Sequence, residues 1–182
     1  MQKKIITDYL DLLDSQREAI FGEIKGVETS ILWQRPAEKE WSIGENLDHG
    51  RVLLRSFRRL LKIFWSIFVP YARLKRCRHY EVYIDDVYER SGFPLNVGWI
   101  WPPKYNAENP VSLDSLNELY INEHLVIRKF YKNKQEELLG NLNIYDPAIG
   151  WINLIQALRV GIYHDEHHFR QVRKLYTELK VD

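Results

Sequence analysis

Residues 42–68, SIGENLDHGRVLLRSFRRLLKIFWSIF, carry the clearest helical pattern in the chain and set the expected fold. Ser42 and Glu45 stand three residues apart, which is the spacing of a capping box at the start of a helix. Behind this cap, apolar side chains recur at helical spacing and form one stripe: Ile43, Leu47, Leu54, Phe57, Leu61, Phe64 and Phe68. The pattern predicts a long amphipathic helix that begins after Ser42. It should end at Pro70, because proline interrupts the helical hydrogen-bond ladder.

Three further stretches show helical spacing, and none alternates convincingly at the strand period. The expected helices cover about 4–25, 113–141 and 151–180. The helix that starts near residue 113 is capped by Ser112 or by Ser115, and Ser115 has Glu118 at capping-box spacing.

The connection between the second and third expected helices is long. Residues 70–111 are rich in aromatic residues, proline and glycine, and a short helix is expected within them at about 85–90. Long helices with two fairly short connections and one long one are typical of a four-helix bundle. We therefore expect an all-α fold, a four-helix bundle with a long excursion, in a single domain over residues 1–182.

Composition limits the function classes that the chain can serve. Its 26 Lys and Arg residues against 25 Asp and Glu residues leave a net charge of +1, too little to favour nucleic acid or an anionic membrane. The single cysteine, Cys77, excludes an internal disulfide or a multi-thiolate metal site and fits a reducing cytoplasm. Residues 1–16 lack the apolar core of a signal peptide, and the most apolar run, 60–72, is too short for a bilayer span. We expect a cytoplasmic protein with no nucleic-acid or membrane partner.

The stretch YHDEHHFRQ, residues 163–171, holds three of the chain's six histidines. Helical residues four apart lie one above the other, so His164 and His168 can direct their rings toward one point. His167 is turned by about 100° and faces elsewhere. The zincin motif requires glutamate directly after the first histidine, whereas Asp165 stands there in this chain. The pair therefore has the spacing of two metal ligands without the catalytic base of that class.

A third histidine is available on the second expected helix. His49 lies at the edge of its apolar stripe, in line with Leu53 and Phe57. Together with His164 and His168 it would make a three-histidine set that leaves room for water or substrate, as catalytic metal sites do. The alternative interpretation is that the clustered histidines are surface residues or a hydrogen-bonded pair in the core, which is the commoner role of an isolated His-x-x-x-His pair.

Two motifs together resemble the DinB/YfiT-like family of metalloenzymes. They are EWSIGENLDH at 40–49 and, about a hundred residues later, DPAIGWINLIQALRVGIYHDEHHFRQ at 146–171. The family's Trp-Ser-x-x-Glu-x-x-x-His signature matches Trp41, Ser42, Glu45 and His49. Its His-x-x-x-His-x-x-Gln signature matches His164, His168 and Gln171, and a Pro-x-x-Gly element before the last helix matches Pro147 and Gly150.

The resemblance implies a four-helix bundle that binds one divalent metal ion, zinc or nickel, through His49, His164 and His168. It also implies a homodimer, and the apolar run 63–69, which exceeds what one bundle stripe needs, points the same way. Family members with an assigned activity are mostly thiol-dependent transferases or isomerases. The expected substrate is therefore a small molecule, and the metal would activate a low-molecular-weight thiol.

Two function classes stay open at this stage. One is a metal-dependent enzyme that activates a thiol or water, such as a thiol S-transferase or a hydrolase. The other is a metal-binding or scaffold bundle without enzymatic activity. A base beside the open coordination position would separate them, and Glu45, one turn before His49, is the candidate, although its alternative role is to cap the helix. Gln171, one turn after His168, either supports a ligand or is exposed.

Overall fold

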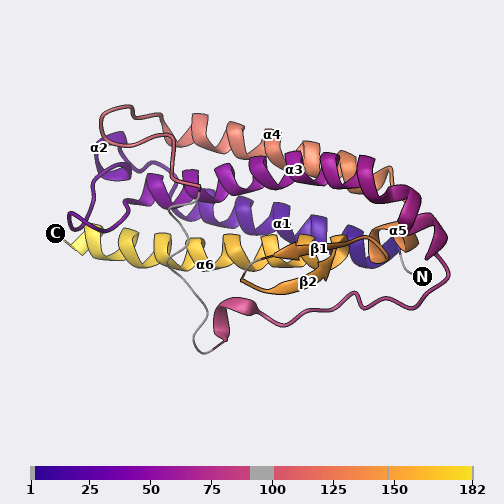
Figure 1. The fold of residues 1–182 in the computed structure, drawn as a ribbon. Helices are drawn as coiled ribbons and strands as arrows, with labels where there is room; N and C mark the ends of the chain where they lie inside the picture. Colours follow the sequence, from indigo (N-terminus) through magenta and orange to yellow (C-terminus); the bar gives the residue numbers. More distant parts are fainter. Residues whose placement is uncertain (1–2, 91–100, 147, 182) are drawn as a thin grey trace.

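The computed structural model describes residues 3–90, 101–146 and 148–181, and helices dominate them (Figure 1). The four long helices are α1 (Lys3–Glu23), α3 (Ile43–Leu74), α4 (Leu113–Lys132) and α6 (Leu154–Val181). The shorter elements are α2 (Thr29–Leu32), the 3-10 helix η1 (Val87–Glu89), α5 (Glu136–Gly140), and the strands β1 (Asn143–Asp146) and β2 (Gly150–Asn153). The long helices lie side by side, which confirms the expected all-α four-helix bundle.

Each long helix packs against two of the others. α3 packs on α4 and α6, and α1 packs on the same two helices. α1 and α6 run in one direction along the bundle, while α3 and α4 run in the other (Figure 1). This antiparallel pairing of α3 and α6 brings the first turns of α3 beside the middle of α6.

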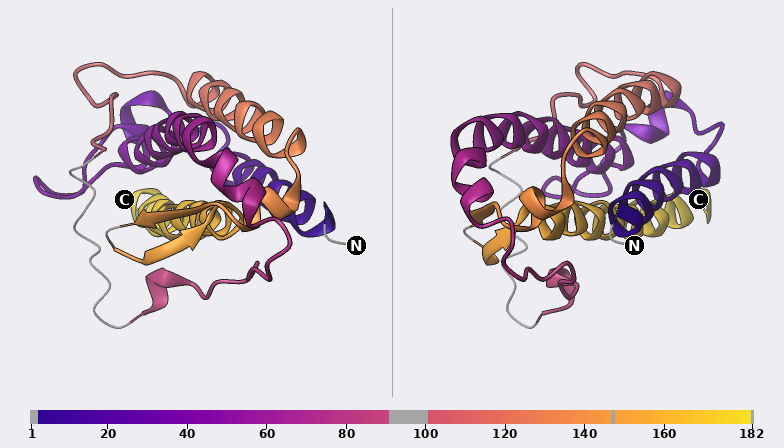
Figure 2. Two further views of the ribbon diagram at one scale, coloured as in Figure 1. Left: turned by 45° about the vertical axis from the view of Figure 1, so that its right-hand side comes forward. Right: turned by 90° about the vertical axis from the view of Figure 1, so that its right-hand side faces the viewer.

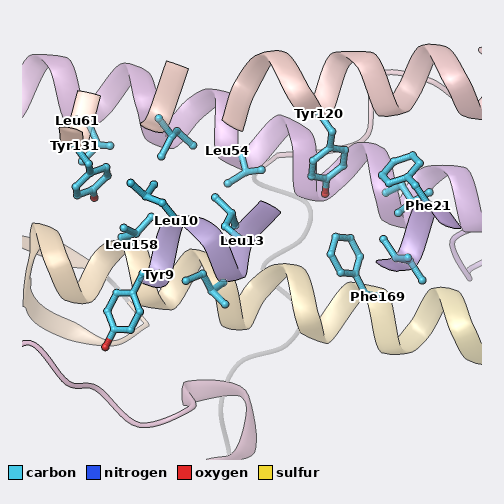
Figure 3. Packing of buried hydrophobic residues seen from close by; sticks show 14 of the residues in the cluster. Tyr9, Leu10, Leu13, Phe21, Leu54, Leu61, Tyr120, Tyr131, Leu158 and Phe169 are labelled. Carbon is cyan, nitrogen blue, oxygen red and sulfur yellow. The ribbon is translucent and has the colours of Figure 1, made fainter. Parts of the chain in front are cut away.

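Aromatic and aliphatic side chains from all four long helices fill the core (Figure 3). Tyr120 of α4 is fully buried, and its ring centroid lies 5.7 Å from that of Phe21 on α1 and 6.3 Å from that of Phe169 on α6. Ring contacts of this kind fix the spacing of the helices that carry them. The stripe predicted for the last helix faces this core: Ile155, Leu158, Ile162, Phe169 and Val172 are buried, and Tyr176 packs against them.

α3 begins as predicted but does not end as predicted. The Ser42 side chain accepts a hydrogen bond from the Glu45 backbone, and the Glu45 carboxylate accepts one from the Ser42 backbone, which completes the capping box. The helix then continues through Pro70 to Leu74. Proline removes one hydrogen bond, and the Ser66 carbonyl that loses its donor belongs to an exposed residue that water can reach. Within the part of the chain that the structure describes, α3 included, no helix has the length and apolarity needed to cross a bilayer.

The predicted third helix, 113–141, is two helices in the structure. Ser112 caps α4, as one of the two predicted alternatives required, and its side chain accepts a hydrogen bond from the Ser115 backbone. α4 ends at Lys132, and α5 turns away to bury Leu138 and Leu139 against the core. A straight helix would carry those two leucines past the end of the bundle, so burial of apolar surface favours the break.

A short hairpin precedes α6, whereas sequence analysis predicted helix from residue 151 and no strand. β1 pairs antiparallel with β2, with Ile144 opposite Ile152. The helix starts only at Leu154 because the Asn153 side chain accepts hydrogen bonds from the backbones of Ile155 and Gln156 and so caps it. Strands of four residues are too short to show a clear alternation in the sequence. Of the Pro-x-x-Gly element, Gly150 begins β2 with a positive φ, and Pro147 lies outside the described residues.

Of the segment 75–90 that follows α3, the 3-10 helix η1 contacts α6 (Figure 2). Tyr163 of α6 donates a hydrogen bond to the carbonyl of Ile84, at 3.1 Å, and Val87 of η1 is fully buried. The short helix predicted at about 85–90 is therefore present as η1. Its contact with α6 places Tyr88 beside the histidines of that helix.

Candidate metal centre

Three histidines that lie far apart in the sequence meet between α3 and α6. His49 stands in the second turn of α3, and His164 and His168 stand one turn apart on α6. One ring nitrogen from each of the three lies within 4.8 Å of the other two. The Nε2 atoms of His49 and His164 are 3.2 Å apart. The two helices are therefore neighbours at the height that the three-histidine prediction required.

The backbone carbonyl of Trp101 determines which nitrogen His49 offers to this cluster. His49 Nδ1 lies 2.8 Å from that carbonyl oxygen. A carbonyl only accepts hydrogen bonds, so Nδ1 carries the proton in this contact and donates it. In a neutral imidazole the other nitrogen, Nε2, then carries the lone pair, and this nitrogen faces His164 Nε2.

The side chain of Asn46 determines which nitrogen His168 offers to the cluster. The Asn46 side-chain amide donates to the carbonyls of Ser42, at 2.9 Å, and of Trp41, at 3.3 Å. These two bonds orient the amide, so its oxygen faces His168 Nδ1 at 3.0 Å and accepts the proton there. His168 therefore also offers its Nε2 nitrogen to the cluster.

In contrast to His49 and His168, His164 has no hydrogen-bond acceptor at its Nδ1 atom among the described residues. This Nδ1 atom is buried, and the Asp165 Oδ1 atom lies 3.7 Å from it. Both Asp165 oxygens are also without a hydrogen bond, and burial raises the pKa of this carboxyl to about 7. A proton on His164 Nδ1 and the Asp165 carboxylate would satisfy each other after a small shift, and such a pairing is common behind metal-bound histidines.

All three rings are held in the neutral form that metal ligands need. Burial lowers the pKa of His49, although its hydrogen bond to Trp101 acts against this. Burial lowers the pKa values of His164 and His168 well below the usual range, and the neighbouring histidines lower them further. At neutral pH the cluster therefore presents lone pairs in place of positive charges.

The spacing fits a single small cation. Two nitrogens bound at about 2.05 Å to a tetrahedral ion are separated by about 3.3 Å. The observed separation of the His49 and His164 Nε2 atoms is 3.2 Å. Neutral imidazoles suit zinc, nickel, copper and iron, so the donor set matches a divalent transition metal.

The other residues singled out from the sequence lie outside this set. Glu45 is buried, but its carboxylate binds the Arg35 guanidinium and the Ser42 backbone. Burial alone would raise its pKa, yet these hydrogen bonds lower it. Gln171 is exposed. His167 stacks on Tyr88, with 5.0 Å between ring centroids, and is not part of the group of three.

Sequence analysis gave neither Asn46 nor Trp101 a role in orienting the histidines. Asn46 carried a usable signal, because a polar residue four positions after the capping serine, on the stripe side of the helix, is buried and needs hydrogen-bond partners. Trp101 contributes a backbone atom from a segment without periodicity, so its side chain gives no indication of this role.

A cavity of about 330 Å³ adjoins the three histidines. α3 and α6 form its long walls, the hairpin β1–β2 closes its far part, and Tyr88 and Trp101 border it near the histidines. A pocket of this size beside potential ligands can admit a small molecule. Fold and site together define an α-helical bundle with a buried three-histidine cluster open to a cavity.

The sequence profile of the DinB superfamily matches residues 12–172. The chain therefore belongs to the DinB superfamily, as the two motifs had indicated. The matched region includes all three histidines of the cluster. Comparison with curated proteins and with solved structures gave no match.

Proposed function

We propose that this protein is a metal-dependent enzyme that holds one divalent ion, zinc or nickel, between His49, His164 and His168. The observation that carries the proposal is the 3.2 Å approach of two Nε2 atoms whose rings are neutral. The Nδ1 atom of His49 is occupied by the Trp101 carbonyl, so its Nε2 lone pair is directed at the other two histidines. A lone pair aimed into a buried group of imidazoles is explained by an ion at that centre.

A bound cation would supply positive charge that lowers the pKa of a coordinated thiol or water molecule. The protein would supply the remaining parts of the site. Trp101 and Asn46 hold two ligand rings in the correct tautomer, and a mainly apolar cavity adjoins the ligands. Because the three ligands are neutral, the charge of the ion stays available to an anionic group such as a thiolate. This supports a low-molecular-weight thiol as the activated molecule, in a reaction of the thiol S-transferase type.

One observation favours a second candidate, a metal-binding or scaffold bundle without catalysis. The Glu45 carboxylate, the base considered from the sequence, is bound to Arg35 and to the helix cap. An enzyme that activates water would need another base, whereas one that activates a thiol needs only the ion to stabilise the thiolate.

Cobalt substitution tests the proposal. Co²⁺ replaces zinc in histidine sites and absorbs visible light according to its ligands. We expect one equivalent of Co²⁺ to bind, and a small thiol such as 2-mercaptoethanol to produce a sulfur-to-cobalt charge-transfer band. The His49→Ala protein should bind no cobalt and show no band, while His79→Ala, which alters an exposed histidine, should behave like the unmodified protein. Cobalt binding without a thiol band would favour the non-catalytic candidate, and absence of cobalt binding would refute the metal site.

We further propose that the protein is a cytoplasmic homodimer. Its single cysteine, Cys77, is exposed and needs no oxidising compartment for folding. Exposed apolar side chains on the second half of α3 support self-association.

A further inference from the structure

We infer that the substrate of this site is an elongated amphiphile, in which an anionic, metal-binding head group is joined to an unbranched apolar tail. The head group rests on the function proposed above. The tail is argued from the cavity alone, so the two parts of the inference can fail separately.

The cavity extends well beyond the histidines, between α3 and α6 and toward the hairpin β1–β2, and is called the channel below. On α3 its lining begins at His49 and continues one turn after another to Phe64, which is roughly 22 Å of helix. On α6 the lining runs from His168 back to Ala157, which is roughly 16 Å. A volume of about 330 Å³ drawn out over that length accommodates a chain better than a broad ring system.

The walls of this channel are apolar. Away from the histidines, its described lining is aliphatic and aromatic, and includes Leu53 and Phe57 of α3 and Ile152 of the hairpin. Asp146 is the acidic exception, and its side chain already accepts hydrogen bonds from the backbones of Ala148 and Ile149 in the hairpin turn. A polar tail would lose its hydration here without compensation, whereas an alkyl tail would gain by burial.

Gly161 keeps the channel open in its middle. It lies on α6 between Ala157 and His164, both of which line the cavity, and it lines the cavity itself. A Cβ atom added at Gly161 would have no neighbouring atom within 4 Å. The space beside this glycine therefore connects the histidine end of the cavity with the hairpin end.

The head group follows from the charges around the histidines. A histidine that binds a metal does so in its neutral form, so the three clustered histidines would bring no negative charge to balance a divalent ion. A thiolate, carboxylate or hydroxamate can supply that negative charge while also binding the metal. The tail then lies along the apolar walls between α3 and α6.

Binding of a homologous series of probes tests this inference. Straight-chain hydroxamic acids with two to ten carbon atoms, each added to the zinc-loaded protein, should bind more tightly by about three- to fourfold per added methylene. The gain in affinity per methylene should cease once the tail reaches the end of the channel. Isothermal titration calorimetry gives the affinities directly and requires no knowledge of the reaction.

Gly161→Leu tests whether the tail lies in the channel, because the added side chain would fill the space beside residue 161. Gly22→Leu is its matched control. Both glycines lie in long helices, both have open space at Cβ, and both substitutions improve helix propensity, but Gly22 is exposed on α1. Gly161→Leu should leave the two-carbon probe unchanged and weaken the eight-carbon probe at least tenfold. Gly22→Leu should bind every probe like the unmodified protein.

Straight-chain carboxylates added to the metal-free protein separate the two parts of the inference. If zinc does not bind but the affinity for carboxylates still rises with chain length and falls in Gly161→Leu, the proposed metal function fails and the apolar tail site stands. If affinity does not depend on chain length, or if Gly161→Leu and Gly22→Leu behave alike, the channel is not a tail site and the inference is overturned.

Discussion

The side-chain oxygen of Asn46 lies 3.0 Å from Nδ1 of His168 and fixes which nitrogen that histidine turns toward the cluster. The two residues are 122 positions apart in the chain and belong to different helices. Asn46 is itself oriented by the carbonyls of Trp41 and Ser42, at the start of α3. The helix cap thus positions a metal-ligand candidate on the facing helix, and the amide of Asn46 is the connecting group.

Removal of this amide should weaken metal binding without removing a ligand. Asn46→Leu keeps a similar volume but cannot accept the His168 proton, so the ring loses its orientation. We expect metal affinity to fall by about 10- to 100-fold. Competition with a chelating dye measures the affinity, and circular dichroism checks that the bundle remains folded. A folded Asn46→Leu protein with unchanged metal affinity would contradict the role assigned to Asn46.

The three clustered histidines of α6 should not be equivalent. His164→Ala and His168→Ala each remove one of three ligands, and the remaining two cannot close the site, so both proteins should lose their metal. His167→Ala should retain it, because that ring is turned away and stacks on Tyr88. Native mass spectrometry at one fixed free-ion concentration compares the three. Equal metal content in all of them would mean that the cluster is not a metal site.

Asp14 should make stability depend on acid pH. Burial alone would raise its pKa, but hydrogen bonds from His124 and Arg128 hold this pKa at about 2, below the usual 3.8 of an aspartate. A carboxyl with a lowered folded-state pKa contributes stability above its unfolded pKa and loses it as the pH falls through the folded value. Asp14→Asn should therefore lower the unfolding free energy by about 1 kcal/mol above pH 4, after allowance for solvent screening of this partly exposed group.

The difference between Asp14→Asn and the unmodified protein should shrink between pH 4 and pH 2. Urea unfolding at a series of pH values measures it. Asp8→Asn on the same helix is the control, because Asp8 is exposed and should show little effect at any pH. A constant difference across the pH range would show that charge on Asp14 is not the cause.

The exposed apolar face on the second half of α3 should mediate dimer formation. Ile63, Ile67 and Tyr71 each have more than half of their surface exposed, at 53%, 61% and 53%. Ile67→Lys should shift the protein from dimer to monomer in sedimentation velocity, because burying a lysine charge in an interface is unfavourable. Leu125→Lys on α4, where the leucine is 58% exposed, should leave the dimer intact. A species of 21.9 kDa for the unmodified protein at micromolar concentration would refute this interface.

Sequence periodicity predicted the helices well where one face is buried along the whole element. α1 and the start of α3 match because an apolar stripe and a capping box are local features. The predicted end at Pro70 was wrong because the cost of a proline depends on whether water can reach the carbonyl that it leaves unpaired. The hairpin before α6 was missed because strands of four residues give too few positions for an alternation to be recognised.

Local spacing and the family motifs also determined the candidate site: His164 and His168 share a face because they are four residues apart, and His49 stands at a height that the Ser42 cap defines. Only the tertiary structure decided which nitrogens face one another, because the tautomer depends on partners from other segments. Trp101 and Asn46 are such partners, and neither contact can be inferred from residue spacing. The structure alone also decided that Glu45 is bound to Arg35 and that an apolar channel leads away from the histidines. Helical periodicity is a property of one segment, whereas hydrogen-bond partners and cavity shape arise only when distant segments pack together.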